Sequence, residues 1–135
     1  MKKLPIYKVL LAEDFEPSRI VISEILDSLG YEYKTVKNGS EAFLAMKYNN
    51  FDLILMDIQM PELNGFEATE LIRRTLPYPK NAVPIIVMTG WEYVSELKNT
   101  YKDEGFDALL TKPFSIERLV EVLSMLLDDK KQEKA

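Results

Sequence analysis

The hydrophobic residues of this chain fall into short continuous runs, and between the runs apolar residues recur every three or four positions. A continuous run bounded by turn signals is typical of a strand buried on both faces, whereas the three-to-four spacing is typical of an amphipathic helix. The runs predict five strands, of which the second alternates only weakly. The predicted strands cover residues 7–12, 31–36, 53–56, 85–88 and 107–111.

Five helices are predicted between and after these strands. Pro17 suits the first turn of the first helix and Gly30 ends it. Ser40 is a candidate cap for the second helix, which we expect to run to about Tyr48. The third follows Gly65, the fourth stops near Gly105 and the fifth opens at Ser115. The side chains expected to face inward are Phe66, Thr69, Ile72 and Leu76 on the third helix, Val94, Leu97 and Tyr101 on the fourth, and Ile116, Leu119, Val120, Leu123 and Leu127 on the fifth.

The order of these elements predicts the fold class. Strands that alternate with helices favour a doubly wound α/β fold, with a parallel sheet, helices on both faces and right-handed crossovers. We expect one domain over residues 1–135, with its core at about 7–127 and a charged tail at 128–135 that frays. The connector 77–84 contains three prolines and is expected to be an extended surface loop.

Composition excludes several kinds of chemistry. The chain has no cysteine and no histidine, which removes disulfides, thiolate catalysis, Ser-His-Asp chemistry and histidine ligands. The net charge of −5 argues against direct binding of nucleic acid and suits a hard cation. No apolar run approaches the roughly 20 residues that cross a bilayer, and the basic start lacks a signal-peptide core. We therefore expect a cytoplasmic protein without membrane insertion.

Polar residues gather where the predicted strands end. Glu13 and Asp14 follow the first strand, Asp57 the third, Thr89 the fourth and Lys112 the fifth. The carboxyl ends of parallel strands meet at one edge of a sheet, where open α/β folds bind ligands. Each residue alone has a plainer explanation as a turn former, a helix cap or a surface charge. Their agreement favours a shared site.

Clustered carboxylates need a cation. Two carboxylates about 4 Å apart repel by roughly 4 kcal/mol at an effective dielectric constant near 20. With oxygen ligands only, Mg²⁺ is favoured and Mn²⁺ is possible. A carboxylate beside a metal ion and a lysine can act as nucleophile toward a phosphoryl group. Lys112 and the Thr89 hydroxyl would then neutralise and bind the phosphoryl oxygens.

These motifs also resemble a known family. The ordered set comprises Glu13-Asp14, Asp57 with Pro61, Asn64 and Gly65, Thr89, and Thr111-Lys112-Pro113-Phe114. In order and spacing it resembles the receiver domain of two-component response regulators, over residues of about 7–127. Residues 60–69 resemble most the receivers of hybrid sensor kinases. The resemblance implies a flavodoxin-like (βα)5 fold with strand order 2-1-3-4-5.

The resemblance also implies roles for individual residues. Asp57 would be the phosphoacceptor, and Asp14, Asp57 and the Gln59 backbone carbonyl would bind Mg²⁺. Glu13 would act through a metal-bound water. Lys112 would pair with the phosphoryl group, and the Lys112–Pro113 bond would be cis. The remaining residue implied at the site is the switch residue Thr89.

The resemblance further implies partners. The phosphoryl donor would be a sensor histidine kinase or a phosphotransfer protein. A downstream target protein would bind the face formed by the fourth helix, the last strand and the fifth helix. A phosphorylation-induced homodimer is left open, as is the choice between a free-standing regulator, a phosphorelay intermediate and the receiver of a hybrid kinase.

The sequence departs from the family pattern at several positions. Glu13 replaces the commoner aspartate of the acidic pair, which is a frequent variant. Gly90, in the switch segment, replaces the usual alanine and should add flexibility. Leu109 lies where many receivers carry the tyrosine or phenylalanine that rotates on activation. For Trp91, we hypothesise that it limits water access together with Gln59; the alternative is a partly buried aromatic that packs on the fourth helix.

Two other function classes compete with the leading one. An interaction module that works without phosphorylation is favoured by Leu109, but the complete acidic and basic set argues against it. A small phosphohydrolase with an aspartate nucleophile would need a second aspartate two residues later. Gln59 occupies that position, so we rank this class low.

Overall fold

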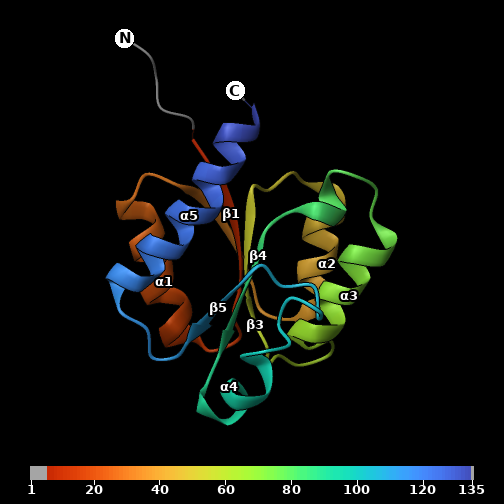
Figure 1. Ribbon diagram of the computed structural model, residues 1–135, viewed down its shortest axis with the longest axis vertical. Helices are drawn as coiled ribbons and strands as arrows, with labels where there is room; N and C mark the ends of the chain where they lie inside the picture. Colours follow the sequence, from red (N-terminus) through yellow and green to blue (C-terminus); the bar gives the residue numbers. More distant parts are fainter. Residues whose placement is uncertain (1–5, 135) are drawn as a thin grey trace.

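A parallel sheet of five strands forms the centre of the computed structural model, which describes residues 6–134 and the side chains of residues 6–127 (Figure 1). The strand order is β2-β1-β3-β4-β5, as predicted. The strands are β1 Lys8–Ala12, β2 Glu32–Val36, β3 Leu53–Asp57, β4 Ile85–Thr89 and β5 Ala108–Thr111. The helices are α1 Glu16–Ser28, α2 Gly39–Tyr48, α3 Gly65–Thr75, α4 Trp91–Leu97 and α5 Ile116–Lys134, with a short 3₁₀ helix η1 at Lys80–Ala82.

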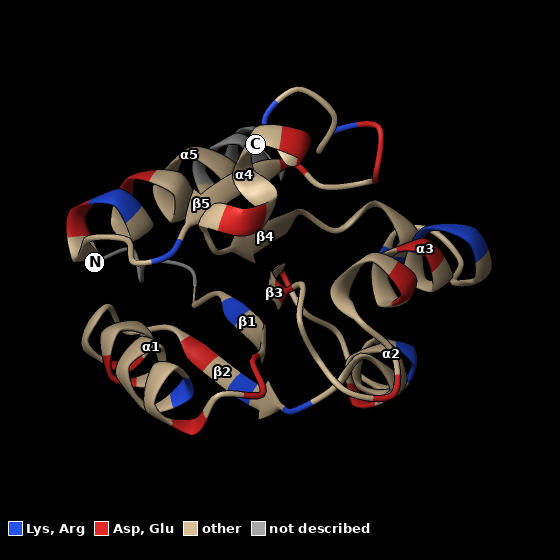
Figure 2. Cartoon of the chain, turned by 90° about the horizontal axis from the view of Figure 1, so that it is seen from below, with Lys and Arg blue, Asp and Glu red and all other residues tan. Residues whose placement is uncertain are grey.

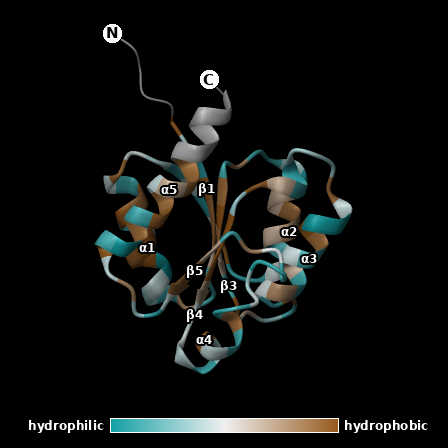
Figure 3. Ribbon diagram, viewed as in Figure 1, coloured by the Kyte–Doolittle hydropathy of each residue, from teal (hydrophilic) through white to brown (hydrophobic). Residues whose placement is uncertain are grey.

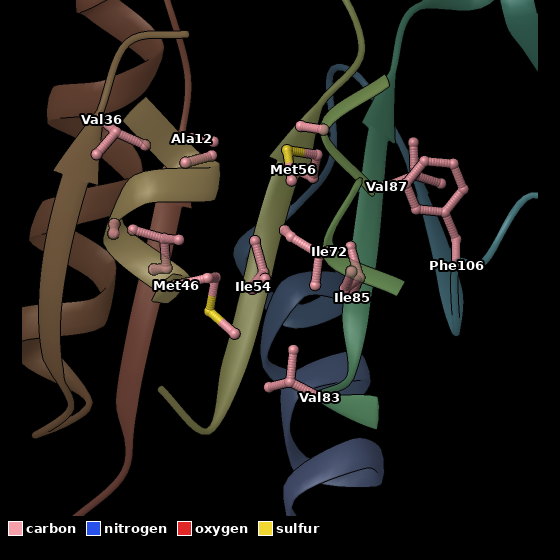
Figure 4. Close-up of a cluster of buried hydrophobic side chains, with 14 of the residues drawn as sticks. Ala12, Val36, Met46, Ile54, Met56, Ile72, Val83, Ile85, Val87 and Phe106 are labelled. Carbon is pink, nitrogen blue, oxygen red and sulfur yellow. The ribbon is translucent and has the colours of Figure 1, made fainter. Parts of the chain in front are cut away.

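Helices cover both faces of the sheet. α1 and α5 lie on one face and α2 and α3 on the other (Figure 1). Successive residues of a strand point to opposite faces, so the central strands supply two separate hydrophobic clusters. The apolar sides of the helices turn toward the sheet (Figure 3). The cluster under α2 and α3 includes the labelled residues of Figure 4, which are Ala12, Val36, Met46, Ile54, Met56, Ile72, Val83, Ile85, Val87 and Phe106.

The register of the strands sets which residues share the carboxyl edge. Ala12 pairs with Met56, Asp57 with Met88, and Thr89 with Thr111. The residues that follow each strand therefore emerge side by side at this edge. The first described residues lie at the opposite edge of the sheet, near the start of β1 (Figure 1). Between residues 6 and 134, no helix combines the length and the apolar character that a membrane span requires.

Two helix starts differ in their caps. The predicted cap of α2, Ser40, is wrong: the Asn38 side chain accepts a hydrogen bond from the Glu41 amide at 2.8 Å. Asn38 has the extended backbone of a capping residue, whereas Ser40 already lies inside the helix. At α5 the prediction is correct, because the Ser115 hydroxyl accepts from the Arg118 amide at 3.0 Å.

Other local predictions need correction. The connector 77–84 is not fully extended but contains η1. α4 ends at Leu97, and turns lead from there to Gly105. Ile116 was predicted to face inward but is 57% exposed, since it is the first residue of α5 and lies beyond the edge of the sheet cluster. The predicted charged tail at 128–135 lies outside the residues whose side chains are described.

The inward face of α4 also differs from the prediction. Tyr93, Leu97 and Tyr101 pack toward the cluster under α2 and α3, at a constant spacing of four residues. Val94, which was predicted to point inward, is half-buried and is not part of that cluster. Leu97 and Tyr101 therefore face inward as predicted, and Tyr93 takes the place that the prediction gave to Val94.

Candidate functional site

The loops that follow the strands build the candidate site at the carboxyl edge of the sheet. Figure 2 views the molecule from this side, with acidic positions at the end of β3 in red near its centre. Among the residues predicted for the site, Asp57 and Thr89 are the last residues of β3 and β4. Glu13 and Lys112 directly follow β1 and β5. The fold therefore brings the ends of four strands together, as the sequence predicts.

The loop after β3 fixes the backbone of Asp57. The amide of Ile58 donates to the Met88 carbonyl at 3.4 Å, and the amide of Gly65 donates to the Ile58 carbonyl at 2.9 Å. A side chain at Gly65 would place its Cβ 2.2 Å from the Asp57 carbonyl oxygen. Only glycine allows this close approach. The start of α3 is thus packed directly against the backbone of Asp57.

A compact ionic cluster surrounds the Asp57 side chain. The Lys112 ammonium donates a hydrogen bond to Glu13 Oε1, and its Nζ lies 3.5 Å from Asp57 Oδ1. Glu13 has no exposed surface, and its Oε2 accepts from the Phe15 amide at 3.4 Å. Asp57 is only 8% exposed. Two buried carboxyl groups therefore share one lysine.

This arrangement makes the Asp57 carboxyl easy to protonate. Burial, and after it the hydrogen bond and charge of Glu13, raise the pKa of Asp57 from 3.8 to about 7. Lys112 opposes this shift but does not cancel it. Burial penalises the charged form of a carboxyl, and a second carboxyl adds repulsion. An incoming cation would relieve both effects.

A cleft of about 440 Å³ opens above this cluster. Asp14, Asp57, Thr89, Gly90 and Lys112 line it, so most of the predicted set meets in one cavity. Glu13 lies buried behind this lining. Thr89 is 1% exposed, and its hydroxyl donates to the Gly90 carbonyl at 3.2 Å. The hydroxyl thus has a partner that it can exchange for a ligand oxygen in the cleft.

The side chains here that could bind a metal ion offer oxygen ligands only, which are the ligands that Mg²⁺ prefers. Asp57 and Asp14 line the cleft, and the buried carboxyls of Asp57 and Glu13 have one lysine between them. Burial, and after it the neighbouring Glu13, raise the pKa of Asp57, and a bound cation would favour its ionised form. The residues therefore fit a divalent cation in kind. Between residues 6 and 134, however, no three acidic side chains already converge as a ligand set, because Asp14 is exposed while Glu13 binds Lys112.

Three further predicted residues lie around the cleft. Gln59 is exposed and lines the cleft through the loop after β3. Leu109 is half-buried on β5 and packs against the cluster under α2 and α3. Trp91 begins α4 with its side chain 75% exposed and does not line this cleft. The structure thus places Gln59 at the cleft, Leu109 in the core beside it and Trp91 toward solvent.

Sequence reasoning missed two aromatic residues of the cleft. Phe15 lines it from the start of α1, and Tyr93 lines it from α4. The recurrence of Tyr93, Leu97 and Tyr101 every four residues was the signal that could have found Tyr93, because these residues all pack toward the same hydrophobic cluster. Nothing in the local sequence singles out Phe15.

The Lys112–Pro113 peptide bond is cis, as the resemblance implied. A second cis bond, Tyr78–Pro79, was not predicted. The fold and the site together define a doubly wound α/β domain with an acidic, lysine-paired cleft at the carboxyl edge of its sheet. Residues 9–124 match the response regulator receiver domain family, and the chain belongs to this family, whose members act in two-component signalling.

Curated relatives include both parts of larger proteins and a protein of similar size. The chain is 32% identical over 133 residues to the aerobic respiration control sensor protein ArcB of Escherichia coli, covering 98% of this chain and 17% of ArcB. It is 30% identical over 121 residues to the polar-differentiation response regulator DivK of Brucella anthropi, covering 90% of this chain and 96% of DivK. The chain thus spans about a sixth of the length of ArcB.

Solved structures share the same fold. The receiver domain of the sensor histidine kinase PA1611 from Pseudomonas aeruginosa is 30% identical with a TM-score of 0.81, covering 92% of this chain and 99% of that one. That structure contains a magnesium ion coordinated in its active site cleft. The chemotaxis response regulator CheY4 of Vibrio cholerae is also 30% identical, with a TM-score of 0.80, covering 90% of this chain and 99% of that one.

Proposed function

We propose that this receiver domain accepts a phosphoryl group on Asp57 from a phosphohistidine of a partner protein, with the help of Mg²⁺. The observation that carries the proposal is the buried pair of carboxyls, Asp57 and Glu13, that share the single lysine Lys112 beside a cleft. A structural ion pair would need only one acid for one lysine. A surplus of negative charge at a cleft suits a site that gains a cation.

The positions of the side chains support this transfer. The Asp57 carboxylate forms a bond to phosphorus while the bond between phosphorus and the partner's histidine nitrogen breaks. Lys112, whose ammonium already lies 3.5 Å from Asp57 Oδ1, can contact one phosphoryl oxygen, and the Thr89 hydroxyl can contact another. Such transfer depends mainly on positioning and on neutralising the phosphoryl oxygens.

Asp57, Asp14 and the Gln59 carbonyl would hold the Mg²⁺ ion, and Glu13 would act through a bound water. When bound, the ion supplies positive charge that favours ionised Asp57 and neutralises phosphoryl oxygens. Mn²⁺ has similar ligand preferences and is an alternative. Support comes from the oxygen-only donors of this cleft and from the magnesium ion in the related PA1611 domain.

Phosphorylation would switch a protein-binding surface. The phosphoryl group adds about two negative charges, which would draw Lys112 and the Thr89 hydroxyl toward it and release the bond from Thr89 to Gly90. Thr89 and Gly90 lead directly into α4. The target-binding face is therefore proposed on α4, β5 and α5, with Leu109 as an aliphatic residue where other receivers place an aromatic one.

The proposed partners are a histidine kinase or phosphotransfer protein as donor and a downstream target protein. We propose that residues 1–135 comprise a single receiver domain that works in the cytoplasm. ArcB is a sensor protein and DivK a response regulator, so both a hybrid-kinase receiver and a free-standing regulator are consistent with the relatives.

The proposal is tested by incubating the protein with acetyl phosphate, with and without Mg²⁺, and measuring intact mass. We expect a gain of one phosphoryl group in the wild type only with Mg²⁺. The Asp57→Asn variant should gain none, because its amide is not a nucleophile, whereas Asp103→Asn, at an exposed position away from the cleft, should react like the wild type. Phosphorylation of the Asp57→Asn variant would overturn the assignment. Binding of a partner without any phosphorylation would favour the interaction module instead.

A further inference from the structure

One hydrogen bond crosses the mouth of the cleft between two elements that are far apart in sequence. The Gln59 side-chain amide donates to the Tyr93 hydroxyl at 3.2 Å. Gln59 belongs to the loop between β3 and α3, two residues after Asp57, and Tyr93 lies in the first turn of α4. The bond therefore connects the two segments that border the cleft on the side of α3 and α4.

Tyr93 is the fixed member of this pair. Its ring is half-buried and packs against the hydrophobic cluster under α2 and α3. On the same face of α4, one turn further on, Leu97 is 3% exposed and anchors the helix to that cluster. Gln59, in contrast, is exposed. The anchored ring of Tyr93 thus holds the flexible Gln59 side chain in one position. Forming this hydrogen bond costs less conformational entropy than ordering two mobile side chains would.

The pair lies on the boundary between two cavities. The inner cavity is the cleft with Asp57 and Lys112, and a second cavity of about 570 Å³ lies beside it, lined partly by Met60 and Phe66. Both cavities are lined by Asp14, Ile58, Gln59 and Tyr93. Because they share these residues, the two cavities adjoin each other. The bond from Gln59 to Tyr93 therefore ties together two residues of the boundary between them.

We propose that the Gln59–Tyr93 hydrogen bond is a latch that limits the access of water from the second cavity to a phosphoryl group on Asp57, so that Tyr93 is a positioning residue for its hydrolysis. This inference rests on the proposed phosphorylation of Asp57. In hydrolysis, water forms a bond to phosphorus while the bond from phosphorus to the Asp57 oxygen breaks. The products are free carboxylate and inorganic phosphate, and one proton goes to solvent. In this proposal Tyr93 acts through its hydrogen bond with Gln59.

The structure gives this role to Tyr93 rather than to Trp91. Trp91 lies two residues earlier on α4, but its side chain is 75% exposed and lines neither cavity. Tyr93 lines both. The two aromatic residues of this turn can therefore be separated by experiment.

The test measures the decay of the phosphorylated protein after removal of acetyl phosphate, in the wild type and in Tyr93→Phe, Gln59→Ala and the double variant. Tyr93→Phe removes one hydroxyl and keeps the ring in the core. We expect decay about three- to tenfold faster, the fold-change that corresponds to one neutral hydrogen bond. The double variant should decay no faster than Gln59→Ala alone, because both single changes break the same bond.

The matched control is Tyr101→Phe, which removes a hydroxyl from a tyrosine in the same cluster that lines neither cavity. Its decay rate should equal that of the wild type. The latch proposal is wrong if phosphorylated Tyr93→Phe loses its phosphoryl group at the wild-type rate. It is also wrong if the fold-changes in decay rate of Tyr93→Phe and Gln59→Ala multiply in the double variant. Either result would leave phosphorylation of Asp57 standing. If the wild type takes up no phosphoryl group at all, the proposed function fails and the latch fails with it.

Discussion

The two edges of the sheet each contain a partly buried cation, but they satisfy it in opposite ways. At the amino edge, Arg73 of α3 donates to the carbonyls of Asn81, Val83 and Gly105 and pairs with Asp107 at 3.0 Å. At the carboxyl edge, a single lysine serves two buried carboxyl groups. At the amino edge, most partners of the arginine are neutral carbonyl groups and only one is a carboxylate. At the carboxyl edge, both partners of the lysine are carboxyl groups, so negative charge is in excess.

The difference separates a structural contact from a binding site. Burial lowers the pKa of Arg73, and the charge of Asp107 opposes that shift, but an arginine stays charged in proteins. Its donors all have fixed partners that join α3 to the starts of β4 and β5. Asp57 lacks such compensation, and its pKa is raised to about 7. The amino edge is therefore complete as it stands, whereas the carboxyl edge would be stabilised by the cation that we propose for it.

The largest expected effect on stability comes from breaking the amino edge. Arg73→Met keeps most of the aliphatic stem but leaves the carbonyls and Asp107 without their donor. Partly buried acceptors without partners are costly. We expect the free energy of unfolding, measured by urea denaturation, to fall by about 2–4 kcal/mol.

The control for this variant is Arg74→Met on the same helix turn. Arg74 forms an exposed ion pair with Glu70 at 3.4 Å. Exposed pairs contribute little, so we expect a change within about 0.5 kcal/mol. Equal losses in the two variants would show that Arg73 does not have the special structural role assigned to it.

The next effect concerns the carboxyl edge and depends on pH. The folded pKa of Asp57 is raised from 3.8 to about 7, so the folded state binds this proton more tightly than the unfolded chain. The stabilisation of the folded state by protonated Asp57 is complete below pH 3.8 and is lost as pH rises through 7. Without divalent cations, Asp57→Asn should therefore be more stable than the wild type by about 1–3 kcal/mol at about pH 8.5, and this gain should shrink toward about pH 5.

Urea denaturation at both pH values, with EDTA present, checks this expectation. Asp103→Asn provides the control at an exposed position and should change stability little at either pH. A gain for Asp57→Asn that does not depend on pH would contradict the burial of a poorly compensated charge.

The smallest of the three effects is stabilisation by the cation. A ligand that binds only the folded state stabilises it by RT ln(1 + c/Kd), where c is the ligand concentration. About 10 mM Mg²⁺ should therefore add about 1.4 kcal/mol if its dissociation constant is about 1 mM. The melting temperature of the wild type should therefore rise with Mg²⁺, while that of Asp57→Asn should rise much less. The same rise in both proteins would place the ion away from Asp57.

The sequence predicted the parts of this structure that depend on simple patterns. Apolar runs located the central strands β1, β3 and β4, because a strand buried on both faces leaves no room for polar residues, whereas the mostly exposed β2 was located only by a weak alternation. The residues after those runs located Glu13, Asp57, Thr89 and Lys112 in one cleft, because parallel strands place their ends together. Along the chain these residues are up to 99 positions apart, so topology alone brings them together.

The features that were missed depend on side-chain contacts that no period encodes. Asn38 rather than Ser40 caps α2 because of a difference of two residues in where the helix begins. The many partners of Arg73 are backbone carbonyls, which every residue carries, so they leave no mark in the sequence. The contact from Gln59 to Tyr93 joins the loop after β3 to α4, and the distance between these segments depends on the whole fold.

The central claim is that Asp57 carries the phosphoryl group, and direct identification of the modified residue tests it best. The wild type is phosphorylated with acetyl phosphate and Mg²⁺ and then treated with borohydride, which reduces an aspartyl phosphate to homoserine, before peptide mass spectrometry. The account predicts homoserine at position 57 and at no other aspartate. Homoserine at another position, or an unchanged Asp57 in a protein that has gained a phosphoryl group, would contradict it.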